Sequence, residues 1–285
     1  MKILVLGCNG MTGHMISLYF CERGYEIYGL ARTESKLVSA FICDAADFSK
    51  MKEIILSNQF DVIINCIAIL NKHAEDDKVA AVRLNSLLPH FLSAITEHTK
   101  TKIIHISTDG VFSGNQGGYT EVDLPDGATF YARSKALGEL NDQKNLTLRN
   151  SIIGPDINVN GIGLLNWFLK NKANELNGFT GAVWTGQTTL QLAKTMEAAI
   201  QQNAVGLVNA VPSEEITKYE LLCLFNKIFY NDRKTIVPVI GLVADKSLRR
   251  TNWNFDYKIP GYEEMLEELY EWMKQHRTLY PHYSL

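Results

Sequence analysis

The first twenty residues constrain the fold of this chain more than any other segment. A short, mostly apolar run at residues 2–6 leads into the glycine-rich stretch 7–13, and residues 14–20 then begin an apolar helix. Strand, glycine turn and helix, in this order, form a phosphate-binding unit. The glycines let the backbone approach a pyrophosphate, and the helix N-terminus attracts its negative charge. We therefore predict dinucleotide binding here; the alternative is an ordinary strand-to-helix turn.

The same alternation continues to about residue 150. Further strands are predicted at 25–30, 40–43, 60–66, 103–107 and 146–149. Helical stretches lie between most of them, including one at 79–99, and residues 113–129 read as a loop over the strand ends. This order predicts an α/β fold, a Rossmann-like, doubly wound parallel sheet with helices on both faces.

The pattern becomes less regular after residue 150. Helices are predicted at 161–172, 188–202, 217–230 and 262–275, with a return strand near 206–211. We expect a dinucleotide-binding domain at 1–150 and a smaller, mostly helical substrate lobe at 151–285. Because doubly wound sheets bind ligands at the carboxyl ends of their strands, this lobe would face those ends and supply the substrate pocket.

Composition narrows the class of protein. The chain has 285 residues, 46% of them hydrophobic, which is enough for a large core. A net charge of −3 gives no reason to expect nucleic acid or membrane partners. The five cysteines are scattered, with no Cys-x-x-Cys pair, and no apolar stretch reaches membrane-spanning length. We expect a cytoplasmic protein with reduced thiols and no metal site.

Three residues indicate proton transfer. Tyr131 and Lys135 are four apart and share one face of a helix. Thr108 ends the buried strand that begins at Ile103. An ammonium beside a phenol favours the tyrosinate and lowers the Tyr pKa, and a Thr hydroxyl holds a substrate carbonyl nearby. Beside a nicotinamide, this set reduces a ketone or oxidises an alcohol.

The Tyr-x-x-x-Lys spacing alone is weak, because two further pairs occur, at Tyr230/Lys234 and Tyr270/Lys274. We interpret both as helix-surface or helix-end pairs. Position distinguishes the first pair, which follows a dinucleotide fingerprint and a strand ending in Ser-Thr.

Taken together, these features resemble an extended short-chain dehydrogenase/reductase, most closely the dTDP-4-dehydrorhamnose reductase group. The matching features run to about residue 151: Gly7, Gly10 and Gly13, Asp44, Asn65 to Ala68, Asn85, Ser107 to Asp109, Val111-Phe112, Tyr131, Lys135 and Arg149 to Ser151. The resemblance implies catalysis by Thr108, Tyr131 and Lys135.

The resemblance also implies a cofactor-binding set. Its members are Gly7, Asn9, Gly10, Met11, Thr12, Gly13, Arg32, Asp44, Asn65, Cys66, Ile67, Ala68 and Asn85, together with Tyr131 and Lys135. In that family Asp44 would bind the adenine, and Asn85 would organise the active site. Other interpretations are an Asx turn for Asp44, a strand-end cap for Asn65 and a helix-surface position for Asn85.

Cofactor choice follows from charge. An acid at the end of the second strand would bind a ribose 2′-hydroxyl and select NAD. Here that strand is followed by Arg32, which suits a 2′-phosphate. We therefore expect NADPH as the cofactor, with NADH as the alternative. The alternative interpretation of Arg32 is a solvated charge in a loop.

For the substrate, the resemblance implies a keto sugar carried on a nucleotide diphosphate, with deoxysugars for surface polysaccharide as the usual product. Expected contacts are Ser107, Asp109, Val111, Phe112, Trp184 and Arg249. The related dehydratases carry Glu where this chain has Gly110, which disfavours dehydration. The reductases most often carry Tyr at Gly110 and Trp at Ile152, so the sugar or its stereochemistry is open.

Two alternatives remain at this stage: a nucleotide-sugar epimerase, and a regulatory subunit that binds NADP without turnover. A homodimer is an expectation from the family. The nucleotide, the sugar and the pathway are not specified by the sequence.

Overall fold

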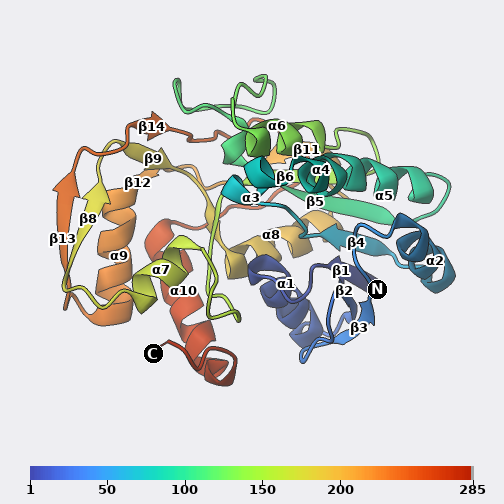
Figure 1. The fold of residues 1–285 in the computed structure, drawn as a ribbon, viewed down its shortest axis with the longest axis horizontal. Coiled ribbons are helices and arrows are strands. Elements are labelled where there is room, and N and C mark those ends of the chain that lie inside the picture. The colour runs from blue at the N-terminus through green and yellow to red at the C-terminus, as the bar shows by residue number, and fades with distance from the viewer. Residues whose placement is uncertain (284–285) are drawn as a thin grey trace.

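The computed structural model describes residues 1–283, and its centre is a seven-stranded parallel sheet (Figure 1). The strands lie in the order β11-β6-β5-β4-β1-β2-β3. Their bounds are β1 Lys2–Leu6, β2 Glu26–Ala31, β3 Ser39–Ile42, β4 Val62–Asn65, β5 Lys102–Thr108, β6 Leu146–Asn150 and β11 Gly206–Asn209. All adjacent pairs are parallel, which confirms the predicted fold class.

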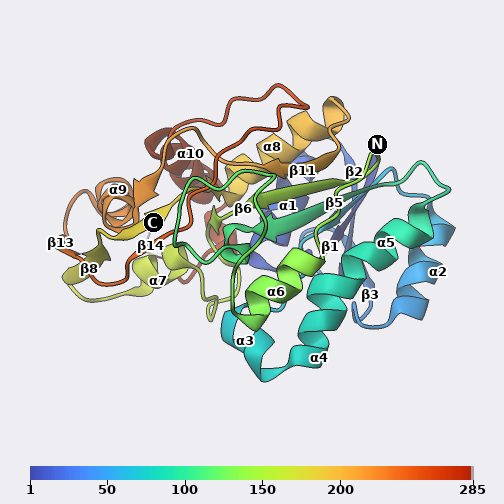
Figure 2. The same cartoon turned by 90° about the horizontal axis from the view of Figure 1, so that it is seen from above.

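Helices cover both faces of this sheet (Figure 2). One face carries α2 Phe48–Asn58, α5 Leu88–Thr96 and α6 Phe130–Leu137. The other carries α1 Met11–Glu22 and α8 Thr189–Gln201, which pack against each other. Strand β1 is apolar at residues 3–6 and fully buried, because helices remove both of its faces from water.

The predicted helical stretch 79–99 is confirmed as helical over residues 78–96, although it is not one regular α-helix. It is divided into α4 Lys78–Ala81, a π-helical turn at Val82–Leu87, and α5. Pro89 has no N–H to donate to the carbonyl of Asn85 four residues earlier, so the regular α-helical ladder is interrupted there. A π-helical turn is a common feature of functional sites, and this one contains Asn85.

Residues 151–283 form a lobe beside the central sheet and contribute one strand, β11, to that sheet. Helices α7 Leu164–Lys170, α9 Lys218–Tyr230 and α10 Tyr262–Gln275 share a hydrophobic core. The lobe also contains small sheets, so it is less helical than expected. Strand β8 Glu175–Phe179 pairs with β13 Thr235–Val239, and β7 Ile152–Ile153 pairs with β10 Gln187–Thr188. Strand β9 Ala182–Trp184 pairs with both β12 Ile216–Thr217 and β14 Ala244–Asp245.

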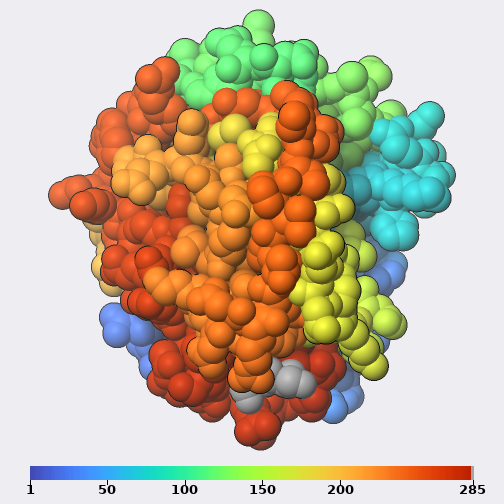
Figure 3. All heavy atoms as spheres, turned by 90° about the vertical axis from the view of Figure 1, so that its left-hand side faces the viewer, coloured from blue at the N-terminus to red at the C-terminus, as the bar shows by residue number. Residues whose placement is uncertain are grey.

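The lobe is joined to the sheet by α8 and by β11, the expected return strand, which pairs with β6. Figure 3 shows the outer face of the lobe, with α9 and β13 in orange beside β8 in yellow. The division at residue 150 stays a prediction. Within residues 1–283, no helix combines the length and apolar character that crossing a membrane requires.

Candidate functional site

The glycine loop between β1 and α1 is a tight backbone turn. Gly7 has φ +78°, a conformation that L side chains rarely adopt, and its N–H donates to the carbonyl of Leu30 at 2.8 Å. A Cβ placed on Gly13 would lie 2.1 Å from the carbonyl oxygen of Gly7. Helix α1 therefore starts directly against the turn, with its N-terminus at the carboxyl edge of the sheet.

The Asn9 side chain connects this loop to the segment after β2 by hydrogen bonds. Its side-chain amide donates to the carbonyl and hydroxyl oxygens of Thr33, both at 3.3 Å, and to the carbonyl of Glu34 at 3.0 Å. The glycine loop is thereby tied to the segment after β2, where Arg32 is exposed. Asn9 and Arg32 are both expected to bind the cofactor, and neither lines the cavity that holds Thr108, Tyr131 and Lys135.

A cavity of about 550 Å³ opens at the carboxyl ends of β1, β4, β5 and β6. The expected residues that line it are Gly10, Met11, Thr12, Cys66, Ile67, Ala68, Ser107, Thr108, Asp109, Tyr131 and Lys135. Segments far apart in sequence thus meet in one place, as the parallel topology requires.

Thr108 and Tyr131 flank Gly110 in this cavity. A Cβ on Gly110 would lie 3.1 Å from the Thr108 hydroxyl oxygen and 3.2 Å from the ring of Tyr131. The Thr108 hydroxyl accepts from the N–H of Gly110 at 3.0 Å and donates to an Asp109 carboxylate oxygen at 3.1 Å. Because Gly110 has no side chain, space remains beside the Thr108 hydroxyl and the Tyr131 ring.

The Tyr131 pKa differs from the expectation. Burial of the phenol raises the pKa to about 12, and this outweighs the lowering by hydrogen bonding with Thr108. Lys135 is not among the causes. The expected lowering by the ammonium is therefore wrong for this structure, and Tyr131 keeps its proton near neutral pH, as a proton donor requires.

Lys135 is 2% exposed, and its ammonium group contacts strand β5. Its Nζ donates to the carbonyl of Ile106 at 2.7 Å and lies 3.2 Å from His105 Nε2. Burial lowers the Lys135 pKa to about 8, while the charge of Glu139 acts in the opposite direction. An amine with a pKa near the working pH both takes and gives a proton readily.

Asn65 and Asn85 are fully buried supports. The Asn65 side chain accepts from the N–H of Ile67, and its amide faces His105. The Asn85 amide bonds to both the N–H and the carbonyl of Ile69 and donates to Ser134, which precedes Lys135. Asn85 thus joins the cavity edge to α6 and does not line the cavity itself, so its helix-surface alternative is wrong.

Asp44 is exposed and forms an Asx turn, its carboxylate accepting from the N–H of Ala46 at 2.8 Å. It lies outside the main cavity. This matches the alternative interpretation of Asp44, and its expected role at the adenine stays a prediction.

A buried ion pair supports the end of β5. Glu139 accepts from Arg149 Nε at 2.9 Å, from Nη2 at 2.6 Å, and from the Ser107 hydroxyl at 2.6 Å. The Arg149 guanidinium lies 4.9 Å from the ring centre of Phe112, which stacks on Tyr119. The Ser107 hydroxyl therefore has a structural partner although Ser107 lines the cavity.

Four of the expected substrate contacts do not line this cavity. Val111 and Phe112 are fully buried in packing and offer no surface to the cavity. Trp184 is 3% exposed, packs against Tyr262 in the core of the lobe, and does not line the cavity. Arg249 is exposed and lines a separate hollow of about 930 Å³. For Val111, Phe112 and Trp184, tertiary packing sets a side-chain direction that the sequence does not encode.

Asn150 and Lys246 line the cavity but were not predicted as site residues, although Asn150 lies in a segment that resembles the family. Asn150 is 2% exposed, is paired in register with Thr108, and its side-chain oxygen and nitrogen meet no hydrogen-bonding partner among residues 1–283. Lys246 is half-buried and forms no ion pair with the described residues. The polar Asn150, at the end of a buried strand, was the one available signal.

The other two Tyr-x-x-x-Lys pairs lie away from the cavity. Lys274 pairs with Glu271 on the exposed side of α10, and Lys234 lies beyond the end of α9, over the Tyr230 ring. Both readings as surface or helix-end pairs are confirmed.

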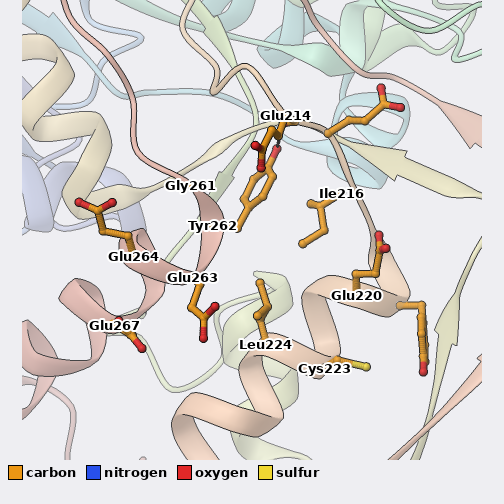
Figure 4. Close-up of a pocket in the computed structure, with 12 residues that line it drawn as sticks. Glu214, Ile216, Glu220, Cys223, Leu224, Gly261, Tyr262, Glu263, Glu264 and Glu267 are labelled. Atoms are coloured by element: carbon orange, nitrogen blue, oxygen red, sulfur yellow. Dashed lines mark hydrogen bonds between the residues drawn. The ribbon is translucent and has the colours of Figure 1, made fainter.

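A wide hollow between α9 and the start of α10 is lined by six glutamates (Figure 4): Glu214, Glu215, Glu220, Glu263, Glu264 and Glu267. It lacks the catalytic groups. No group of three or more potential metal ligands occurs in the part of the chain that the structure describes.

Fold and cavity together define the class: an extended short-chain dehydrogenase/reductase, with a glycine loop, a strand-end Thr and a helical Tyr/Lys pair around one cavity. The family model described as the RmlD substrate binding domain matches residues 1–250, and the chain belongs to this family. The resemblance seen in the sequence is confirmed.

Three relatives illustrate the likeness. A probable low-salt glycan biosynthesis reductase of Haloferax volcanii is 31% identical over 146 residues, 49% of this chain and 48% of that protein, so the match spans about half of each. Methionine adenosyltransferase 2 subunit beta of Danio rerio is 23% identical over 87% of this chain and 80% of its own. The dTDP-4-dehydrorhamnose reductase of Bacillus anthracis, solved in complex with NADP, superposes with a TM-score of 0.81 at 20% identity, covering 95% of this chain and 98% of that one.

Proposed function

We propose that this protein is an oxidoreductase that uses NADPH to reduce a 4-keto-6-deoxy sugar carried on a nucleotide diphosphate. The observation that carries the proposal is the single cavity in which Thr108, Tyr131 and Lys135 adjoin the glycine loop. A cytoplasmic location, a homodimer and a role in deoxysugar or surface polysaccharide synthesis belong to the same proposal.

The residues present fit a dinucleotide. Only glycine is tolerated where Gly13 meets the carbonyl of Gly7, so the backbone N–H groups at the start of α1 stay open to phosphates. Gly10, Met11 and Thr12 would hold the pyrophosphate, and Cys66 to Ala68 would line its path toward Lys135. Arg32, exposed after β2, is the group for a ribose 2′-phosphate.

NADPH bound there would supply a hydride to the carbonyl carbon of the sugar. The Thr108 hydroxyl positions the carbonyl oxygen beside the phenol. Tyr131, whose pKa of about 12 keeps it protonated, gives its proton to the oxygen as negative charge develops there. Lys135 then restores that proton, since its pKa of about 8 lies close to the working pH.

Asn150 would contact the substrate directly. An amide buried without a partner costs roughly 1–3 kcal/mol unless a ligand group satisfies it. Its place in register with Thr108 puts it beside the reacting carbonyl, where a sugar hydroxyl both accepts and donates. With Gly110 and Ile152 in place of larger aromatic side chains, we expect a sugar that differs from 4-dehydrorhamnose in bulk or stereochemistry.

One observation favours a second function. The likeness to methionine adenosyltransferase 2 subunit beta extends over most of the chain, whereas the reductase of Haloferax volcanii aligns over half. A regulatory subunit that binds NADP without turnover is therefore the second candidate. The complete set of Thr108, Tyr131 and Lys135 in one cavity supports catalysis over that role.

The test is NADPH oxidation, followed by absorbance, with dTDP-, UDP- and GDP-linked 4-keto-6-deoxy sugars, and with NADH in parallel. Stoichiometric oxidation with one sugar nucleotide, faster with NADPH than with NADH, is the expected result. Tight NADPH binding with no oxidation of any of them would contradict the proposal and favour the regulatory role.

A further inference from the structure

Two polar side chains, Asn65 and His105, form a buried row behind the catalytic lysine. Asn65 Nδ2 lies 3.2 Å from His105 Nδ1, and His105 Nε2 lies 3.2 Å from Lys135 Nζ. Asn65 and His105 are fully buried, and Lys135 is nearly so. Burial lowers the His105 pKa well below its usual value, and the charge of Lys135 lowers it further. The ring is therefore neutral and carries one N–H.

Asn65 determines which ring nitrogen carries that proton. Its Oδ1 accepts from the N–H of Ile67 at 3.1 Å, so its amide nitrogen faces the ring. A reversed amide would set its NH₂ group against the N–H of Ile67, leaving two donors opposed. His105 Nδ1 is therefore the acceptor in the contact with Asn65, and the ring proton lies on Nε2, toward Lys135.

This arrangement matters for the charge on Lys135. An ammonium has three donors and no acceptor, so it opposes the Nε2–H of His105, whereas an amine accepts from it through its lone pair. Nζ donates to the carbonyl of Ile106 at 2.7 Å, a bond available in both forms. The row thus favours the deprotonated state of a residue that must lose and regain a proton.

We propose that His105 is a positioning residue for proton transfer, whose Nε2–H stabilises the amine left on Lys135 when it reprotonates Tyr131. The catalytic step rests on the proposed reduction. The phenol proton goes to the substrate oxygen, an ammonium proton of Lys135 restores the phenol, and the freed lone pair on Nζ accepts from His105. A proton from water then returns Lys135 to the ammonium.

Other titratable groups surround this pair. Tyr131 lies on the same helix as Lys135, Glu139 lies two residues beyond the end of that helix, and Cys66 faces Lys135 from the end of β4. His90, on α5, adds its charge effect at His105 when protonated. Glu139 favours the ammonium, whereas burial and the Nε2–H of His105 favour the amine.

The first test uses the unsubstituted protein and no substrate. Nitrogen-15 NMR of labelled histidine reports which ring nitrogen is protonated. We expect the Nε2–H form for His105, unchanged between pH 6 and pH 9. An Nδ1–H form, or a ring that becomes charged in this range, would overturn the proposal.

The second test is the titration of Lys135, followed by carbon-13 NMR of labelled lysine in the full-length protein. The midpoint is expected near pH 8 in the unsubstituted protein. His105→Gln, which retains an N–H near Lys135, should keep it there. His105→Phe should raise it by at least about half a unit, and Asn65→Asp, which draws the ring proton to Nδ1, should raise it too.

An unchanged midpoint in both His105→Phe and Asn65→Asp would refute the role of His105. In turnover, the high-pH limb of kcat should move in the same direction in His105→Phe, with the NADPH Kd within about twofold. Because the two NMR tests need no substrate, failure of the proposed reduction and failure of the His105 proposal are distinguished.

Discussion

The buried pair of Arg149 and Glu139 makes the most quantitative prediction about the site. The two side chains are 1% and 8% exposed, and Glu139 takes three hydrogen bonds, two from Arg149 and one from Ser107. Glu139→Leu leaves the guanidinium buried without its partner, which costs about 3–5 kcal/mol. At roughly 2–4 °C per kcal/mol, the Tm should fall by roughly 6–20 °C.

The assay is thermal and urea unfolding of matched variants. The double variant Glu139→Leu/Arg149→Met removes both charges and should recover most of the loss, because an apolar pair of similar volume replaces the ion pair without an unpaired charge. Glu271→Leu is the control, since its pair with Lys274 is exposed and should contribute at most about 1 kcal/mol. If Glu139→Leu were as mild as Glu271→Leu, the reasoning would be refuted.

Three further predictions concern the cofactor, the substrate and acid stability. Gly13→Ala places a Cβ 2.1 Å from a backbone oxygen and should weaken NADPH binding at least about tenfold by fluorescence titration, whereas Gly261→Ala, with open space, should not. Asn150→Leu should reduce kcat/KM about ten- to a hundredfold without lowering the free energy of unfolding, since its amide has no partner to lose; lost stability with intact kinetics would contradict this. Burial lowers the His14 pKa to about 4 from 6.5, so the unfolded chain binds its proton first, and stability should fall as the pH drops from above 6.5 toward 4. Near pH 4 the lowered His14 pKa corresponds to a loss of about 3 kcal/mol in the free energy of unfolding. His14→Asn should flatten the stability–pH curve between pH 6.5 and pH 4. An identical slope in both proteins would show that His14 is not the group responsible.

Much of the fold was predictable because its signals are local. The glycine loop follows a strand within seven residues, and buried parallel strands appear as short apolar runs such as residues 103–107. The parallel sheet then fixes which strand ends meet, which is why Thr108 was rightly expected beside Tyr131.

The rest depends on tertiary contacts that spacing does not encode. The direction of Phe112 is set by Arg149 and Tyr119, and the breakup of the long helix at Asn85 by a proline four residues later. The Tyr131 pKa was predicted in the wrong direction because burial, which the sequence does not measure, exceeds the lowering by the Thr108 hydrogen bond.

The unpaired amide of Asn150 and the protonation of His105 also depend on tertiary contacts. Whether a buried amide has a partner, or which nitrogen of a ring is protonated, follows from groups on neighbouring strands. Such features become visible only once the strand ends are assembled.

The central claim is that Tyr131 donates the proton in a reduction dependent on NADPH. Its most direct test is a single-turnover measurement of NADPH oxidation in Tyr131→Phe beside the unsubstituted protein, with the sugar nucleotide that the substrate panel identifies. We predict an unchanged NADPH Kd and a rate lower by about a hundredfold or more. An unchanged rate in Tyr131→Phe would contradict it.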